Sequence, residues 1–363
     1  MRKRNYFDYL LSPLELLRTK KVLQVNPTAA PVHRPDVPVK LTVIEYDKTK
    51  AFSEVLQNAE AAFPFLNSPS ISWINVDGLN KKEVETLCAH FGIHPLIIED
   101  ILSINQRPKM DEINGLVFCL LSMMYFNPEH NSVETEQISI VLGKNFVISF
   151  QEMPDKDVFN TLREKLKLAT SKVRQAGPDF LFYSLIDAIV DHYFLVMEQL
   201  GEHIEFLEEQ IIRSPNKRSL AQINIIRKEM IVLKRNIAPV REIVSGILRS
   251  ESELIEERTE KYFKDVYDHI IQANDLAENY RDMMLNLQDL YLSNVNLKLN
   301  EVMKVMAIVT CLLAPATVIG GIFGMNFDRI PLLHNQWGFF ISVGVMLLVP
   351  VFMIILFKRR GWF

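Results

Sequence analysis

The chain has 363 residues, of which 48% are hydrophobic, and its formal net charge is −4. This length allows one large domain or two, and the weak net charge argues against a nucleic-acid-binding surface. The three cysteines, Cys88, Cys119 and Cys311, are too widely spaced for a zinc site or a disulfide framework, which indicates buried thiols in a reducing compartment.

Residues 1–39 are predicted to form an N-terminal extension. Its basic start is not followed by an uninterrupted apolar core, so we expect no cleaved signal peptide and a cytoplasmic N-terminal part. The segment is amphipathic as far as Leu17 and then rich in proline from Pro27 to Pro38. This pattern favours a partly ordered tail.

Residues 40–155 show mainly strand-like patterns. Apolar spacing of three to four predicts short helices at 81–91 and 95–103, and Gly78 precedes the first of them. Runs of β-branched and aromatic residues predict five strands, at 41–46, 71–76, 116–126, 136–142 and 145–150. Short turns separate the last three strands, which indicates a hairpin meander. We therefore expect a cytoplasmic α+β domain, arranged as a mixed α/β sandwich.

From residue 156 the apolar spacing becomes helical. Two helices, at about 178–212 and 220–248, are separated by Ser214-Pro215-Asn216. They predict a cytoplasmic helical hairpin over residues 156–255.

The following helix begins near Glu256 and meets no Gly or Pro before Pro315. If it is unbroken to Phe323 it has about 68 residues and a length of roughly 100 Å at 1.5 Å per residue. Such a length exceeds the core of a single domain. Residues 256–304 are therefore predicted to be a stalk helix that leads out of the cytoplasmic body.

Two segments near the C-terminus, 305–325 and 337–357, carry no charge over 21 positions each. A helix of about 20 apolar residues crosses the ~30 Å of bilayer hydrocarbon, so both segments are predicted transmembrane helices. An external loop, 326–336, joins them, and a basic tail, 358–363, follows.

The flanking charges predict the orientation of these two helices. Cations lie before the first segment and after the second, whereas Arg329 and His334 are the basic residues of the loop. The flanking cations are Lys298, Lys304, Lys358, Arg359 and Arg360. By the positive-inside rule both termini are cytoplasmic, in a multi-pass protein of the cell (inner) membrane.

The first segment carries a stripe of small and weakly polar residues at helical spacing. The stripe consists of Asn300, Met303, Met306 or Ala307, Thr310, Ala314, Thr317, Gly320 or Gly321, and Gly324. Such residues suit close packing between helices, and they equally suit a narrow, uncharged, water-lined pore. Because two helices cannot enclose a pore, the second interpretation requires several subunits.

The first segment ends in Gly324-Met325-Asn326, after a very long helix and before one further span. In this setting the tripeptide is specific, and the chain resembles the CorA family of magnesium transporters from about residue 70 to its end. Phe323 replaces the tyrosine that usually precedes this motif. Four stretches carry the resemblance: FGIHPLIIEDILSINQRPK (91–109), YSLIDAIVDHYF (183–194), FKDVYDHIIQ (263–272) and NEVMKVM (300–306).

The resemblance implies a funnel-shaped homopentamer in the lipid bilayer, with first spans around the pore and second spans outside them. It implies a divalent-cation channel for Mg²⁺ influx down the electrochemical gradient, with Mg²⁺ also acting as regulator and Co²⁺ as a further cargo. Binding of nucleic acid is not expected.

The predicted pore residues offer uncharged oxygens. Mg²⁺ holds its water shell tightly, so a ring of five Asn326 amides beside Gly324 and Met325 would accept the hydrated ion. Thr317, Thr310 and Asn300 would form further rings, although Asn326 could also serve only to cap the helix.

A hydrophobic gate and an acidic outer mouth are also implied. Met306 is the candidate for the gate, with Ala314 where relatives commonly have a second large apolar residue; ordinary packing of Met306 stays an alternative. Asp328 is the outer-mouth acid, and Leu332 stands where a second acid is usual, so weaker attraction of cations is expected.

The resemblance also implies a cytoplasmic regulatory metal site. Asp100 of one subunit and Asp265 of its neighbour would bind Mg²⁺, with Glu99, Asp187 and Asp191 close by. Facing carboxylates repel one another unless a divalent cation neutralises them, so internal Mg²⁺ would hold the subunits in a closed arrangement. The alternative is that these are ordinary solvated acids.

Rival interpretations stay open. One is a Co²⁺ or Zn²⁺ transporter of the same superfamily, and another is a non-conducting, membrane-anchored coiled-coil scaffold. Catalysis is rejected, because the sequence has no P-loop, nucleophile elbow or HExxH motif, and His192 and His203 are not spaced as a compact metal site.

Overall fold

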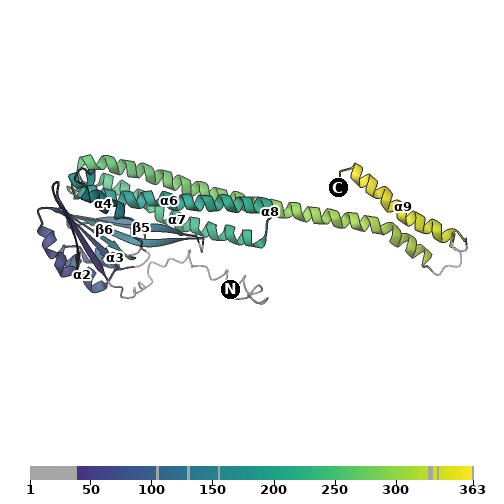
Figure 1. The fold of residues 1–363 in the computed structure, drawn as a ribbon, viewed down its shortest axis with the longest axis horizontal. Coiled ribbons are helices and arrows are strands. Elements are labelled where there is room, and N and C mark those ends of the chain that lie inside the picture. The colour runs from purple at the N-terminus through teal and green to yellow at the C-terminus, as the bar shows by residue number, and fades with distance from the viewer. Residues whose placement is uncertain are drawn as a thin grey trace. The chain divides into compact units, whose positions relative to one another are not determined.

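The computed structural model describes residues 39–103, 106–128, 131–153, 156–325, 330–332 and 335–361. The chain divides into two compact units, Met1–Gln288 and Asp289–Phe363 (Figure 1). The predicted extension, 1–39, therefore lies outside the described residues except for its last residue, Val39.

A seven-stranded sheet forms the centre of the first unit. Its order is β2-β1-β3-β7-β6-β5-β4, and β3 pairs with β7 in parallel while all other neighbours are antiparallel. The strands are β1 (Lys40–Tyr46), β2 (Ala51–Leu56), β3 (Ile71–Asp77), β4 (Lys109–Ile113), β5 (Leu116–Asn127), β6 (Ser132–Leu142) and β7 (Phe146–Gln151). The predicted meander of the last three strands is confirmed.

The strands β2 and β4 were not expected from the sequence. Both are edge strands, and β2 is exposed over almost its whole length, so its side chains show no alternation between buried and solvated positions. β4 is short and polar, with the sequence KMDEI. Apolar periodicity cannot report a strand that buries neither face.

Both faces of the sheet are covered. On one face the apolar core is shared with a 3₁₀ helix, η2 (Ala59–Asn67), and with α2 (Lys81–His90) and α3 (Pro95–Leu102). On the other face α6 (Pro178–Arg213) lies against β5, where the buried Tyr193 hydroxyl donates to the carbonyl of Ser122 at 2.7 Å (Figure 1). Burial on both faces explains why β5 and β7 are almost continuously apolar.

The helices that follow the sheet begin in different ways. Two short helices, α4 (Asn160–Lys167) and α5 (Lys172–Gln175), precede α6. Next, α7 (Lys217–Arg249) begins after Asn216, whose side chain accepts hydrogen bonds from two backbone N–H groups of its first turn. One compact unit holds the sheet and these helices, and the boundary suggested at residue 155 stays a prediction.

The first turn of α8 (Glu257–Phe323) is held by a side chain of another helix. Asp179, in the first turn of α6, is buried, and its Oδ2 atom accepts hydrogen bonds from the backbone N–H of Glu256 at 3.1 Å and from Thr259 Oγ1 at 2.5 Å. A carboxylate at a helix N-terminus satisfies free N–H groups and interacts well with the helix dipole. α6 and α8 are thereby joined at their starts.

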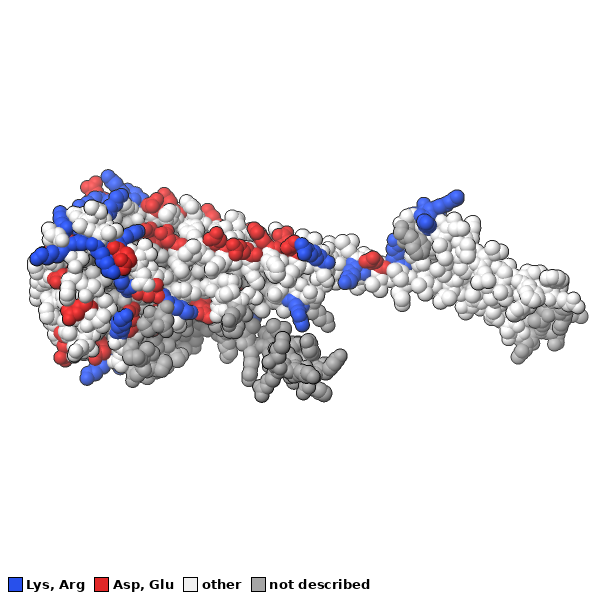
Figure 2. Space-filling model, viewed as in Figure 1, with Lys and Arg blue, Asp and Glu red and all other residues white. Residues whose placement is uncertain are grey.

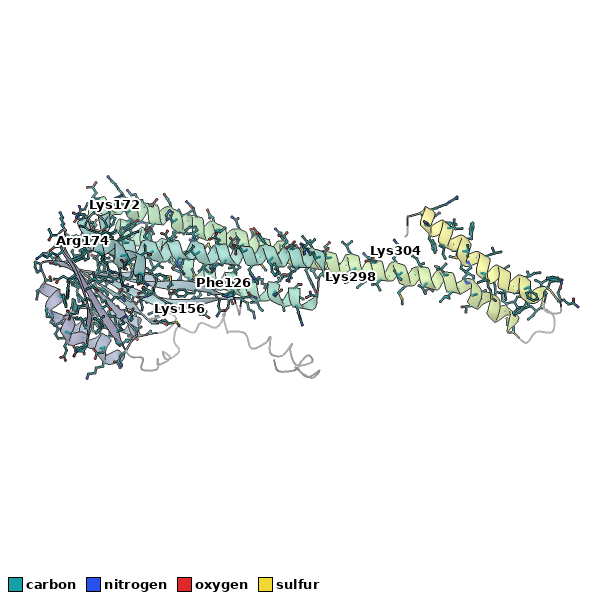
Figure 3. All side chains as sticks on the ribbon, in the orientation of Figure 1. Phe126, Lys156, Lys172, Arg174, Lys298 and Lys304 are labelled. Atoms are coloured by element: carbon teal, nitrogen blue, oxygen red, sulfur yellow. The ribbon has the colours of Figure 1, made fainter. Side chains whose placement is uncertain are left out.

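The long helix is confirmed: α8 runs unbroken for 67 residues and belongs to the first unit as far as Gln288 and to the second unit beyond it. Figure 3 shows the side chains of Lys298 and Lys304 projecting from it. A turn-containing segment, described in part, leads from α8 to α9 (Gly338–Arg359).

Three described helices are long and apolar enough to cross a membrane, namely α6, α8 and α9. The most apolar window of α6 is 61% buried, whereas those of α8 and α9 are each 6% buried. Figure 2 shows α9 and the end of α8 almost free of charged side chains, apart from basic residues at the C-terminal end of α9.

Candidate functional sites

In the second unit, one face of α8 lies toward α9 (Figure 1). Ile308 is buried, and Leu312, Ile319 and Phe323 are half-buried, at successive intervals of four, seven and four residues. A methyl group placed on Gly320 would lie 3.9 Å from Met346 Cε of α9, which is ordinary van der Waals contact. These positions therefore form the packing face of the helical hairpin.

Apart from Gly320, the predicted stripe lies on the other side of α8. At about 100° per residue, Thr310, Ala314 and Thr317 are more than a quarter turn away from the packing face. Every residue of the stripe is exposed: Asn300, Met303, Met306, Ala307, Thr310, Ala314, Thr317, Gly320, Gly321 and Gly324. Most of the stripe is thus not used to pack α8 against α9, and it is available to water or to another copy of the chain.

The threonine hydroxyls of the stripe have their hydrogens committed to the helix. Thr310 Oγ1 donates to the carbonyl of Met306 at 2.9 Å, and Thr317 Oγ1 donates to that of Leu313 at 3.1 Å. The lone pairs of both oxygens are left to accept hydrogen bonds. A hydrated cation presents water hydrogens outward, and these uncharged oxygens could accept hydrogen bonds from them.

The stripe ends where α8 ends. The backbone N–H of Gly324 donates to the carbonyl of Gly320 at 3.0 Å, and a Cβ on Gly324 would lie only 3.2 Å from that oxygen. Glycine therefore suits the tight end of the helix. The next residue, Met325, is half exposed, while Asn326 and Asp328 lie outside the described residues.

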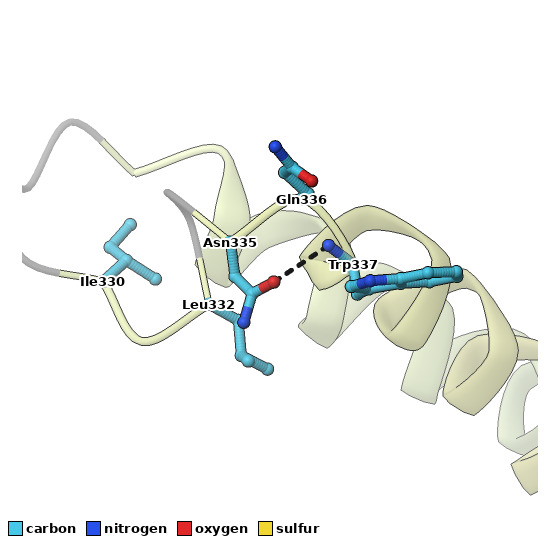
Figure 4. A pocket seen from close by; sticks show the side chains of 5 residues that line it. All are labelled: Ile330, Leu332, Asn335, Gln336 and Trp337. Atoms are coloured by element: carbon cyan, nitrogen blue, oxygen red, sulfur yellow. Dashed lines mark hydrogen bonds between the residues drawn. The ribbon is translucent and has the colours of Figure 1, made fainter.

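The described part of the predicted loop forms an open depression at the start of α9 (Figure 4). The side chain of Asn335 accepts a hydrogen bond from the backbone N–H of Trp337 at 2.9 Å. Leu332 has a φ of 69°, an uncommon left-handed conformation for a branched residue. The five lining residues carry no formal charge: Ile330, Leu332, Asn335, Gln336 and Trp337.

Gly338 is required for the close approach of this loop to α9. A Cβ at this position would lie 2.0 Å from the backbone oxygen of Leu332, a distance that no side chain tolerates. The tight loop therefore depends on a residue without a side chain.

The two residues of the expected gate differ in size, as the sequence requires. Met306 is 65% exposed in the protomer and projects a large apolar side chain, whereas the exposed Ala314 projects a methyl group. Met306 therefore presents a much larger apolar surface than Ala314 does.

In the first unit, three side chains of types that can bind a metal ion lie close together. Asp187 and Asp191 of α6 and His269 of α8 each offer a ligand atom, and these atoms lie within 4.8 Å of one another. The Tyr183 hydroxyl donates to Asp187 Oδ2 at 3.2 Å. The predicted acids Asp187 and Asp191 are thus brought together.

Negative charge accumulates at this cluster. Burial, and then the charge of Asp191, raise the pKa of the Asp187 carboxyl above its ordinary value, and Asp265 acts in the same direction. Asp265 itself is exposed on α8. A cation at the cluster would relieve the repulsion between these carboxylates.

Asp100 has a different environment. Its carboxylate pairs with the Lys109 ammonium at 2.5 Å, and its backbone carbonyl accepts a hydrogen bond from Gln137 Nε2 at 2.9 Å. Burial alone would lower the pKa of Lys109, but the hydrogen bond and charge of Asp100, together with Asp111, raise it. Its neighbour Glu99 is exposed on α3. The described contacts of Asp100 are thus separate from those of the α6 acids.

Sequence reasoning missed two residues at these sites. His269 follows Asp265 by four positions and so shares its face of α8, a spacing that was present in the stretch FKDVYDHIIQ. Lys109 ends the first stretch of the resemblance, but its pairing with Asp100 depends on the place of β4 beside α3.

Comparisons with known proteins agree with one another. A family model described as "CorA-like Mg2+ transporter protein" matches residues 68–359. The "Cobalt/magnesium transport protein CorA" of Thermotoga maritima is 38% identical over 331 residues, which are 91% of this chain and 93% of that protein.

Two solved structures share the fold. The complete structure of the CorA magnesium transporter from Methanocaldococcus jannaschii has a TM-score of 0.74 at 20% identity and covers 89% of this chain and 98% of that one. The ZntB cytoplasmic domain from Vibrio parahaemolyticus has a TM-score of 0.55 at 16% identity and covers 70% of this chain and 98% of that domain. The full-length match includes the mixed α/β domain, the long helix and the apolar C-terminal helices.

Proposed function

The chain belongs to the family of CorA-like Mg²⁺ transporter proteins, and from that premise we propose that it forms a channel for Mg²⁺. The family consists of transporters, so the chain is not an enzyme. Five copies would surround one axis, with α8 lining the path and α9 outside it. Mg²⁺ would pass with most of its water shell retained.

The observation that carries this proposal is the exposed stripe of α8. Most of it faces away from α9, and it combines small residues with hydroxyl oxygens that can accept hydrogen bonds, such as those of Thr310 and Thr317. A lipid-facing surface would be expected to carry bulky apolar residues, as the exposed side of α9 does. Other copies of α8 and the water between them are therefore the most suitable environment for this stripe.

The absence of charge along the stripe suits conduction. A ring of carboxylates would hold Mg²⁺ tightly by its charge and slow its passage. Mg²⁺ releases its waters reluctantly, and amide and hydroxyl oxygens can accept hydrogen bonds from the intact water shell. Asn300 would provide the inner ring, and Asn326 the outer one. The membrane potential drives entry, since a divalent ion gains about 4.6 kcal/mol at 100 mV, twice the value for one charge.

The orientation follows from the basic residues that flank the hairpin. Lys298 and Lys304 precede the span of α8, and Lys358 and Arg359 end α9. By the positive-inside rule, these positions favour a cytoplasmic location for both termini and an external loop. In this orientation Met306 lies near the inner end of the path, where a ring of five side chains would block ions by excluding water. Ala314, deeper in the span, would leave the path wide.

Regulation by internal Mg²⁺ is proposed for the first unit. Asp100 would face Asp265 of the neighbouring copy, with Glu99, Asp187 and Asp191 beside them, and bound Mg²⁺ would hold the closed arrangement. In the protomer Lys109 already neutralises Asp100, so Mg²⁺ must compete with an internal cation. Replacing Lys109 with Met should therefore lower the Mg²⁺ concentration that half-inhibits flux, and an unchanged or raised concentration would contradict this role.

Transport is tested by uptake into proteoliposomes that contain the full-length chain. We expect Mg²⁺ uptake by the unchanged protein, a large loss with Asn326→Ala, and normal uptake with Asn286→Ala, which removes an exposed amide from the first unit. Equal uptake with both variants would remove Asn326 from the path.

The same vesicles separate the rival functions. Uptake of Zn²⁺ without Mg²⁺ would favour a zinc transporter, and entry of Co²⁺ beside Mg²⁺ would extend the cargo. Absence of flux for all three ions, in vesicles shown to contain the oligomer, would favour a non-conducting scaffold.

A further inference from the structure

Tyr125, on β5, has one hydroxyl hydrogen and two acceptors within reach. Its Oη atom lies 3.1 Å from Glu136 Oε2, on the neighbouring strand β6, and it also contacts the backbone carbonyl of Lys156, shortly before α4. A hydroxyl group donates a single hydrogen bond. Burial, and then the charge of Glu136, raise the pKa of the Tyr125 hydroxyl above its ordinary value, so this hydrogen is kept at neutral pH.

The three oxygen atoms of this group require two hydrogens. The carbonyl of Lys156 can only accept, so Tyr125 must donate to it. The contact at 3.1 Å then joins two oxygens, and a hydrogen on Glu136 Oε2 is needed to make it a hydrogen bond. The other oxygen of this carboxyl, Oε1, accepts from the backbone N–H of Met153 at 2.7 Å. The arrangement is therefore complete when Glu136 is protonated.

The surroundings of Glu136 allow it to keep that hydrogen near neutral pH. Burial raises the pKa of the carboxyl to about 7, and the charge of Glu152 acts in the same direction. Hydrogen bonds from Met153 and Tyr125 would favour the ionised form, but burial outweighs them. Glu136 therefore changes its charge within the ordinary range of intracellular pH.

The elements packed around Glu136 carry further ionisable groups. These groups include Glu134 of β6, Asp77 of β3, His192 of α6, Glu229 of α7, and Glu152, Lys156 and Asp157 between β7 and α4. The Lys156 ammonium pairs with Glu134 at 2.5 Å, and Asp157 pairs with Arg163. His192 lies edge-on to the Tyr125 ring, and burial lowers its pKa, so the imidazole is neutral at pH 7. Among these groups, Glu136 is the one that shares the hydrogen of Tyr125.

We propose that Tyr125, Glu136 and Lys156 form a proton-dependent hydrogen-bond switch in the first unit. When Glu136 is protonated, it donates to Tyr125, and Tyr125 donates to the Lys156 carbonyl. When Glu136 is ionised, it accepts the hydrogen of Tyr125, because a charged acceptor forms the stronger hydrogen bond. The Lys156 carbonyl is then released, and with it the chain that leads into α4.

The switch gives the channel a second regulatory input, the internal proton concentration. Tyr125 contacts α6 through His192, which adjoins Asp191, one of the acids that the proposed function places beside the regulatory Mg²⁺. A change in the hydrogen bonds of Tyr125 therefore alters the packing against this helix. This effect on flux rests on the proposed function, whereas the switch itself does not.

Infrared absorption of the full-length protein in detergent tests the binding of the proton. Protonated and ionised carboxyl groups absorb at different frequencies, so the protonated band of Glu136 should disappear between about pH 6 and pH 8. Glu136→Gln should lack this change, because an amide does not ionise. The matched control is Glu134→Gln, which removes an acid from the same strand and should keep the change. An identical pH difference in the unchanged protein and Glu136→Gln would overturn the proposal.

Hydrogen exchange of residues 156–160 tests the switch itself. Glu136→Gln imitates the protonated acid, since its amide N–H can donate to Tyr125 while its oxygen accepts from Met153. At pH 8 these residues should exchange several-fold faster in the unchanged protein than in Glu136→Gln, up to about the tenfold expected for one net hydrogen bond. At pH 6 the two proteins should exchange alike. Equal exchange at pH 8 would contradict the switch.

Tyr125→Phe gives an independent measurement, which also serves if Glu136→Gln does not fold. Without the hydroxyl group the Lys156 carbonyl has lost its donor at every pH. Residues 156–160 should then exchange faster than in the unchanged protein at pH 6 and equally fast at pH 8. The same difference at both pH values would show that the proton on Glu136 does not control the contact.

Flux distinguishes failure of the switch from failure of the channel. The internal Mg²⁺ concentration that half-inhibits flux should shift less with internal pH in Glu136→Gln than in the unchanged protein and in Glu134→Gln. If the vesicles conduct no Mg²⁺, the channel proposal fails while hydrogen exchange still decides the switch. Equal shifts in all three proteins would show that the switch does not regulate flux.

Discussion

Helices α6 and α9 are both apolar enough to cross a membrane, but they use their apolar side chains in opposite ways. The apolar window of α6 is 61% buried within its unit, and that of α9 is 6% buried. The sheet and neighbouring helices already cover α6, whereas α9 presents Leu347, Leu348 and Phe352 to its surroundings at 64–69% exposure. Composition therefore identifies the helices that are apolar enough to enter a membrane. Low burial within the protomer identifies those whose apolar side chains still need to be covered by lipid or by other copies of the chain.

The same contrast separates the two faces of α8 in the second unit. The face toward α9 is apolar and at least half-buried, while the stripe on the other side is exposed and partly polar. Bulky side chains on α9 suit lipid, and small ones on α8 suit close approach of other copies. The hairpin thus needs two different environments that one protomer does not provide.

Truncation of a large side chain should have the largest effect on the free energy of unfolding. The size of this effect should depend on which unit holds the residue. Phe182 of α6 is fully buried, so Phe182→Ala should cost about 3–5 kcal/mol. Leu348 of α9 is 69% exposed in the protomer, so Leu348→Ala should cost far less. Thermal unfolding of both full-length variants in detergent measures the difference, and equal losses would break the comparison.

The join between α6 and α8 should be the next most sensitive feature. Asp179→Ala leaves the buried hydroxyl of Thr259 and the backbone N–H of Glu256 without their acceptor, which should cost about 2–3 kcal/mol. Asp179→Asn keeps one acceptor oxygen and should cost less. Thermal unfolding measures both, and an Asn variant as unstable as the Ala variant would show that charge, not capping, holds the join.

Glycine substitutions in the second unit should differ by position. Gly338→Ala places a methyl group against the backbone oxygen of Leu332, so the loop must move, at a cost of about 1–3 kcal/mol. Gly344→Ala, in the middle of α9, meets no atom within 4 Å and gains helix propensity. The first should lower the melting temperature of the full-length protein and the second should not. Similar effects of the two would mean that the loop is not tightly held.

The buried acid of β6 should give the smallest effect, visible as a pH dependence. Burial raises the pKa of Glu136 to about 7, although Tyr125 and the backbone N–H of Met153 donate to it. Between about pH 4.5 and pH 7 the Glu136 carboxyl is therefore protonated in the folded state and ionised in the unfolded state. The free energy of unfolding should decrease as the pH rises through this range. Glu136→Gln should flatten that decline, on the order of 1–3 kcal/mol. Melting temperatures from pH 5 to 8 provide the check, and an undiminished slope would exclude Glu136.

Helices and strands that bury one face against the core could be predicted from the sequence, because burial imposes an apolar periodicity. Elements that bury no face could not be predicted. The periodicity of α6 and α8 follows from burial of one side, and their predicted bounds lie within a few residues of those observed. β2 buries no side chain, so no pattern marks it. Motif resemblance grouped Asp187 with Asp191, but the addition of His269 needs the contact between α6 and α8, which no local spacing encodes.

The stripe shows a second limit of sequence reasoning. Its spacing predicts that Thr310, Ala314 and Thr317 share one face, but it leaves packing and pore lining equally open. Only the position of α9 shows that this face is turned away from the partner helix of the same protomer.

The central claim is that the stripe of α8 lines a water-filled path shared by several copies. The most direct test is Mg²⁺ flux through Thr317→Cys in a Cys311→Ser background, treated with a water-soluble cationic thiol reagent. Cys88 and Cys119 are fully buried, and burial raises the pKa of the Cys88 thiol to about 12, so both should stay unreactive. We predict block of flux at Thr317→Cys and no modification of Leu348→Cys. Unchanged flux together with labelling of Thr317→Cys by a lipid-soluble reagent alone would contradict the claim.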